Sequence, residues 1–149
     1  MRADAGLRDL VGYRMKRAFA VIQADLSRVL EPFGLRMIPF SALVVIARQP
    51  GIGQGQLAAA LAVERSNLVA PLDGLEARGL IRREAVPGDR RALALKPTPA
   101  GLTLAEAALA AVRAHEARLM AGVSEADVAA LFRACAAIET VPEREETSG

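Results

Sequence analysis

The sequence predicts a mainly α protein with one small β-hairpin, and three observations support this fold class. Hydrophobic residues make up 52% of the 149 residues but aromatic residues only 3%, so the core must be built from Ala, Leu and Val, which favour helices. Apolar residues recur at steps of three and four along most of the chain. One stretch, residues 80–96, instead alternates around a turn-forming cluster. We expect one domain spanning residues 1–149.

The first predicted helix is long and runs from Leu7 to Leu30. Its apolar residues form one stripe, which is the pattern of an amphipathic helix. Pro32 and Gly34 end it, because proline cannot continue a helix and glycine readily leaves helical geometry.

Three shorter helices are predicted next, separated by Pro-Gly and other turn signals. Pro39 opens the first, and Gly79 is placed to cap the last. Pro71 falls inside the last of them and should bend it. The glycine-rich residues 51–55 precede no lysine and follow no predicted strand, so they are interpreted as a helix linker rather than a phosphate-binding loop. The three helices span Phe40 to about Arg48, about Gln54 to Leu61, and about Arg65 to Arg78.

A β-hairpin and two further helices complete the chain. Leu80–Val86 and Ala92–Lys96 alternate partly and flank the turn-forming residues 87–90. Thr98 and Pro99 provide an N-cap and a first-turn proline for a helix that Gly122 breaks. Ser124 then begins the last helix with a sequence close to a capping box.

This order of elements, four helices, a hairpin and two helices, predicts a winged helix-turn-helix with a lobe at about residues 39–98. The terminal helices, about residues 7–30 and 99–139, carry apolar stripes that one subunit cannot cover. We therefore expect N- and C-terminal dimerisation helices and a homodimer. The alternative is a monomer whose terminal helices pack only on each other.

The charge distribution points to a nucleic acid partner. The formal net charge is only +2, but residues 78–96 hold six basic and two acidic residues, or +4, so the rest of the chain sums to −2. A basic segment of this kind suits a phosphate backbone. The alternative interpretation is a solvated charged loop.

The second helix of the predicted helix-turn-helix offers groups that can pair with DNA. If Leu68, Leu72 and Leu75 face inward, the opposite side of the helix points outward. A cation, a hydroxyl and an amide in the first turn match guanine, phosphate and adenine edges. In the alternative, Ser66 and Asn67 only satisfy the start of the helix. The outward candidates for DNA contact are Arg65, Ser66, Asn67 and Ala70.

Two runs of sequence, residues 57–83 and 89–101, resemble the multiple-antibiotic-resistance regulator (MarR) family. The run Leu75-Glu76-Ala77-Arg78-Gly79-Leu80 and the Asp-x-Arg of Asp89 and Arg91 carry the resemblance, which extends over about Leu7 to Ile138. It implies that Arg91 enters the minor groove and that Asp89 holds the Arg91 side chain in place. Arg82, Arg83 and Arg90 are then expected on phosphates.

The resemblance also implies a repressor that a small molecule releases from a pseudo-palindromic operator. The implied effector is an aromatic acid, a phenol or an aromatic acyl-coenzyme A. Phe33 and Phe40 have core packing as their alternative. The single His115 lacks the neighbours of a metal site, so neither a metal nor a cofactor is expected. The candidate effector contacts are Tyr13, Arg14, Arg17, Phe33, Arg36, Phe40 and His115.

Other classes of protein fit the sequence less well. An enzyme would need a nucleophile with a base, a metal cluster or a phosphate loop, and one His and one Cys provide none of these. Cys135 lies on the apolar stripe of the last helix, where packing explains it. A single cysteine, no signal peptide and no long apolar run predict the cytoplasm and no membrane. The remaining alternative is a winged-helix adaptor that binds protein without binding an operator.

Overall fold

The structure, a computed structural model, describes residues 2–143, which form two compact units that divide at residues 115 and 116. The predicted fold class, mainly helical with a small antiparallel sheet, is confirmed. Short 3-10 turns, Ala5–Leu7, Glu31–Phe33 and Arg65–Leu68, precede or follow the longer helices. The elements are α1 Val11–Leu30, α2 Met37–Arg48, β1 Ile52–Gly53, α3 Gln54–Leu61, α4 Val69–Ala77, β2 Ile81–Val86, β3 Asp89–Pro97, α5 Pro99–Leu119 and α6 Glu125–Glu139.

Several predicted boundaries moved, and each shift has a local cause. The α1 helix begins at Val11, after the first 3-10 turn, rather than at Leu7. The α2 helix begins at Met37, so Pro39 lies in its first turn, where its missing N–H has no helical partner to lose. The bounds of α3 agree with the prediction.

The sheet has three antiparallel strands in the order β1-β3-β2. The sequence prediction missed β1, a two-residue strand in the segment that was interpreted only as a linker, where Ile52 pairs with Leu95. The hairpin turn contracts to Pro87 and Gly88, and Gly88 adopts a φ of 84° that glycine tolerates without strain. The β3 strand therefore starts at Asp89, three residues earlier than expected.

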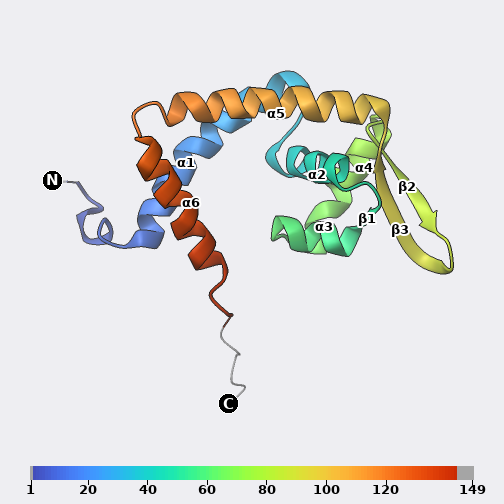
Figure 1. The fold of residues 1–149 in the computed structure, drawn as a ribbon, viewed down its shortest axis with the longest axis horizontal. Helices are drawn as coiled ribbons and strands as arrows, with labels where there is room; N and C mark the ends of the chain where they lie inside the picture. The colour runs from blue at the N-terminus through green and yellow to red at the C-terminus, as the bar shows by residue number, and fades with distance from the viewer. Residues whose placement is uncertain (1, 144–149) are drawn as a thin grey trace, which may run out of the picture. The chain divides into compact units, whose positions relative to one another are not determined.

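The core of the first unit lies where α2, α3 and α4 meet the sheet. Figure 1 shows these three helices and the β2–β3 hairpin gathered beneath the N-terminal part of α5. Of the inward positions predicted for the helix-turn-helix, Leu61 is half-buried against the core, and the others are buried: Leu57, Ala58, Leu68, Leu72 and Leu75. Burial of this set fixes which side of α4 remains exposed.

The junction between the hairpin and α5 is held by one side chain, Thr98. Its hydroxyl accepts a hydrogen bond from the Gly101 N–H at 3.0 Å and donates one to the Gly79 carbonyl at 2.6 Å. The predicted N-cap is therefore confirmed, and the same hydroxyl also ties α5 to the end of α4.

Replacing this hydroxyl should weaken the fold. We expect Thr98→Ala to lower the free energy of unfolding by about 1–2 kcal/mol, because a cap and a carbonyl partner disappear together. Thr98→Ser keeps the hydroxyl and is the matched control in chemical denaturation. Equal losses in both variants would show that the methyl group, and not the hydroxyl, matters here.

The second unit contains the end of α5 and the whole of α6. Ser124 caps α6 as predicted, since its Oγ accepts a hydrogen bond from the Asp127 N–H at 3.1 Å. No residue of α6 is fully buried, and Phe132 is 72% exposed. Cys135 is half-buried, so the packing expected for it is only partial. The helix thus presents an apolar surface to its surroundings.

Among residues 2–143 no single helix is long and apolar enough to cross a membrane. One bent pair of segments, Val11–Phe33 and Met37–Arg48, satisfies both criteria when its two halves are taken together.

Candidate nucleic-acid interface

A polar tip precedes α4 and consists of Arg65, Ser66 and Asn67. After α3 the chain turns through Ala62, which has a φ of 52°, and then forms the 3-10 turn Arg65–Leu68. Leu68 points into the core, whereas the three polar residues and Ala70 are exposed. The tip therefore stands in front of the first turn of α4, with its side chains available to a partner.

The helix predicted over Arg65–Arg78 is in fact two pieces, and this changes the role of Pro71. The α4 helix begins at Val69, so Pro71 is its third residue. The first four N–H groups of a helix have no internal acceptor, so proline removes no hydrogen bond at this position. Pro71 therefore costs α4 no internal hydrogen bond, and the change from the 3-10 turn to α4 falls just before it.

Arg65 packs against the start of α3. A methyl group built on Gly55 would lie 3.7 Å from the Arg65 guanidinium carbon, so the side chain covers this glycine. This contact restricts the long arginine side chain before any partner arrives, which reduces the entropy lost on binding.

In the hairpin, Asp89 contacts the backbone of Arg91. Its Oδ1 accepts a hydrogen bond from the backbone N–H of Arg91 at 3.0 Å, so the carboxylate fixes the backbone at the start of β3 rather than the guanidinium. Within residues 2–143 the Arg91 guanidinium makes no ion pair. Arg90 and Arg91 are both exposed beside the turn and remain available to an anion.

The structure gives Arg83 a different role from the expected phosphate contact. Its guanidinium pairs with Asp73 at 2.9 Å and with Glu76 at 3.3 Å, and the side chain is only 21% exposed. Both acids lie on α4, so Arg83 braces the hairpin against that helix. Such a brace fixes the relative position of the two elements that are expected to contact DNA.

Glu84 ties the two long strands together on the outer part of the hairpin. It lies 2.9 Å from Lys96 on β3 and 3.4 Å from Arg82 on β2. The hydrogen bond from Lys96, with the positive charges of Lys96 and Arg82, lowers the pKa of the Glu84 carboxyl. Arg82 remains exposed despite this contact, so it can still meet a phosphate.

Sequence reasoning missed the role of Arg78, which was counted only as part of the basic segment. Its guanidinium donates to the carbonyls of Phe33 at 3.0 Å and of Gly34 at 2.9 Å. It therefore joins the end of α4 to the loop before α2. No local signal in the sequence separates this arginine from its neighbours, because its acceptors lie 44 and 45 residues away.

The expected effector residues do not gather in one place. The Tyr13 hydroxyl donates to Asp4 at 2.7 Å, and this bond raises the pKa of Tyr13. Phe40 is buried in the core, and Phe33 is half-buried against it, as their alternative interpretation held. His115 is 1% exposed, with its Nδ1 against the Asp25 carboxylate. Arg14 and Arg17 are exposed on α1.

Of the candidate effector contacts, Arg36 lines a sizeable cavity. This cavity, of about 1070 Å³, lies between α1, the start of α2 and the first turn of α4. We call it the α1–α4 cavity. Its walls include Phe19, Met37 and Ile38, apolar residues that the sequence analysis did not single out. Ala70 and Pro71, in the first turn of α4, also line it. The cavity therefore combines apolar side chains with one cation, Arg36, and one anion, Glu31, and it reaches the first turn of α4.

Comparison with known proteins identifies the family. The sequence signature of the MarR family matches residues 33–92. The HTH-type transcriptional repressor Rv2887 of Mycobacterium tuberculosis is 33% identical over 111 residues, which cover 74% of this chain and 80% of that protein.

Two solved structures agree with this result. The transcriptional repressor CouR bound to a 23-mer DNA duplex superposes with a TM-score of 0.87 at 34% identity, covering 93% of this chain and 99% of that one. CouR from Rhodococcus jostii RHA1 bound to p-coumaroyl-CoA gives a TM-score of 0.82 at 30% identity, covering 93% and 98%. The sequence match, the relatives and the shared fold agree, and the chain belongs to the MarR family of transcriptional regulators.

Proposed function

We propose that this chain is a sequence-specific repressor that binds a pseudo-palindromic operator as a homodimer and leaves it when a small aromatic or anionic effector binds. The observation that carries the proposal is the exposed pair of elements in one lobe, the polar tip at Arg65–Asn67 and the hairpin end with Arg90 and Arg91. A helix tip suits the major groove, and an arginine beside a narrow turn suits the minor groove. We also propose that it acts in the cytoplasm.

Dimer formation explains the apolar surface of the terminal helices. Leu10, just before α1, and Val11, Met15 and Phe19 on α1 are each at least 40% exposed, and α6 adds Leu131, Phe132 and Ile138. Surfaces of this kind normally mark a protein contact. Two copies joined through these helices would present two half-site readers at a fixed spacing, which a palindrome matches.

We propose the α1–α4 cavity as the effector site. Arg36 can pair with a carboxylate or phosphate, and Phe19, Met37 and Ile38 can contact an aromatic ring. The similarity to a repressor solved with p-coumaroyl-CoA supports an aromatic acid or its thioester as ligand. Because Ala70 and Pro71 form part of the wall, an occupant would touch the helix that is proposed to read DNA.

Replacing Arg36 tests this assignment. We expect Arg36→Gln to require about 10-fold more aromatic acid to release DNA, which corresponds to the loss of one charged hydrogen bond. Arg17→Gln removes the same charge from α1, outside the cavity lining, and is the control. If Arg17→Gln has the larger effect, the effector lies against α1 and the assignment to the α1–α4 cavity is wrong. Fluorescence anisotropy of a labelled operator provides the measurement.

A mobility-shift assay tests the proposed function as a whole. The full chain is mixed with its own upstream DNA and titrated with aromatic acids and their coenzyme A thioesters. We expect a shifted protein–DNA complex, which the correct effector should dissociate. Binding of a protein partner with no DNA shift at any salt concentration would favour the adaptor alternative instead.

A further inference from the structure

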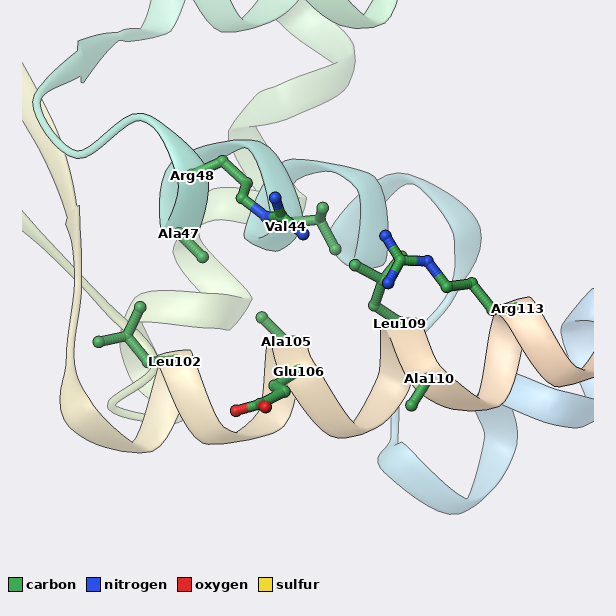
Figure 2. A pocket seen from close by; sticks show the side chains of 9 residues that line it. All are labelled: Val44, Ala47, Arg48, Leu102, Ala105, Glu106, Leu109, Ala110 and Arg113. Carbon is green, nitrogen blue, oxygen red and sulfur yellow. The ribbon is translucent and has the colours of Figure 1, made fainter.

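One exposed apolar side chain of α4, that of Val69, belongs neither to the core nor to the α1–α4 cavity. Val69 is the first residue of the helix and is 50% exposed. The α1–α4 cavity takes Ala70 and Pro71 from this helix instead. A further cavity lies between α2 and α5, and none of the described residues that line it belongs to α4 (Figure 2). Val69 therefore lies on open surface, immediately after the polar tip.

The ion pairs of α4 show which way Val69 faces. Residues three and four positions apart share one side of a helix, so Val69, Asp73 and Glu76 form one stripe along α4. Asp73 and Glu76 pair with Arg83 of the hairpin at 2.9 and 3.3 Å. The stripe therefore faces the hairpin, and Val69 is the end of it nearest the polar tip. This places Val69 on the side of α4 that lies between the two elements proposed to contact DNA.

An apolar side chain at this position suits a base edge in the major groove. In a helix-turn-helix, the N-terminal residues of the recognition helix contact base edges. Thymine alone presents a methyl group there, and apolar side chains contact it. The polar tip can recognise bases through hydrogen bonds, whereas Val69 offers two methyl groups and no side-chain hydrogen bond. A β-branched side chain in a helix keeps one preferred rotamer, so little side-chain entropy is lost when it meets a partner.

We propose that Val69 is a specificity-determining residue that contacts the C5 methyl group of one thymine in each operator half-site. This rests on the proposed function, because it requires an operator and two copies of the chain. The contact removes apolar surface of both valine and thymine from water, which favours the complex. Cytosine has no methyl group at that place, so the contact favours thymine.

Replacing thymine by deoxyuridine removes that methyl group and keeps the base pair. Each thymine of the protein's own upstream duplex, together with its symmetry mate, is replaced in turn, and anisotropy gives the Kd of the full chain. For one pair of thymines we expect wild-type binding to weaken about 15-fold, or about 4-fold for each methyl group that loses its contact. Val69→Ala should bind the unmodified duplex about 10-fold more weakly than the wild type. It should distinguish thymine from deoxyuridine at that pair by less than about 2-fold.

Two further variants complete the test. Val69→Thr keeps one of the two methyl groups and should retain at least about 3-fold preference for thymine. Val141→Ala removes two methyl groups from a 68% exposed side chain after α6, and should leave the preference within about 2-fold of the wild-type value.

The outcomes separate this inference from the proposed function. If the wild type binds its upstream duplex tightly but every thymine pair has the same effect in the wild type and in Val69→Ala, the role of Val69 is wrong and the proposed function stands. If the wild type binds the upstream duplex no better than a scrambled one, the proposed function fails, and the inference fails with it.

Discussion

Arg91→Ala should reduce operator affinity by about 30-fold or more while leaving a folded dimer. One arginine that contacts DNA contributes about 1–3 kcal/mol, and a dimer carries two copies, so the expected loss is about 2–6 kcal/mol. The side chain is exposed, and its backbone is already held by Asp89 through the Arg91 N–H. Removal of the guanidinium should therefore not disturb the hairpin. Anisotropy of a labelled duplex measures the affinity, and circular dichroism checks the fold.

Arg48→Ala is the matched control for that experiment, because it removes the same charge from an exposed arginine outside the tip and the hairpin. We expect it to change operator affinity by less than about 3-fold, because it alters only the long-range electrostatic potential of the protein. Arg91→Ala should also reduce the slope of log Kd against log salt concentration, by an amount that corresponds to about two phosphate contacts per dimer. Equal effects of the two substitutions would contradict a specific role for the hairpin.

Gly101→Ala should cause a large loss of stability in the first unit. A methyl group at Gly101 would lie 1.9 Å from the Leu80 carbonyl oxygen and 2.9 Å from its carbon. Both are backbone atoms that cannot rotate away, so α5 would have to move off the start of β2. We expect a loss of about 3–5 kcal/mol, enough to unfold a marginal domain.

Gly74→Ala has the opposite expected sign and is the matched control. This glycine lies inside α4, and a methyl group there would meet no atom within 4 Å. Alanine should raise the free energy of unfolding by about 0.5–1 kcal/mol, because glycine loses more backbone entropy in a helix. Urea denaturation of both variants measures the two effects. A destabilised Gly74→Ala together with a stable Gly101→Ala would contradict the packing described here.

The parts of the fold that depend on local signals could be predicted from the sequence. The bounds of α3, the caps at Thr98 and Ser124 and the inward positions Leu68, Leu72 and Leu75 all follow from patterns within a few residues. The two-residue β1 could not be found in this way, because it exists only through its pairing with Leu95 on β3. A strand of that length has no period of its own.

The candidate site divides in the same manner. The exposure of Arg65, Ser66 and Asn67 follows from helical periodicity, even though the turn there proved to be 3-10 rather than α. Two other contacts depend on tertiary structure: Arg83 pairs with Asp73 and Glu76, and Arg78 bonds to the loop before α2. The sequence alone does not distinguish these two arginines from Arg90. The same limit explains why Arg36 alone among the effector candidates proved to line the α1–α4 cavity.

The salt dependence of operator binding tests the central claim most directly. The Kd of the wild-type protein for its own upstream duplex, and for a scrambled duplex of equal length, is measured over a series of salt concentrations. We predict tight binding to the upstream duplex, at least about 10³-fold weaker binding to the scrambled one, and a slope that corresponds to about 6–10 phosphates. Equal affinity for both duplexes, or a Kd that does not change with salt, would contradict an interface built from the polar tip and the arginine-bearing hairpin.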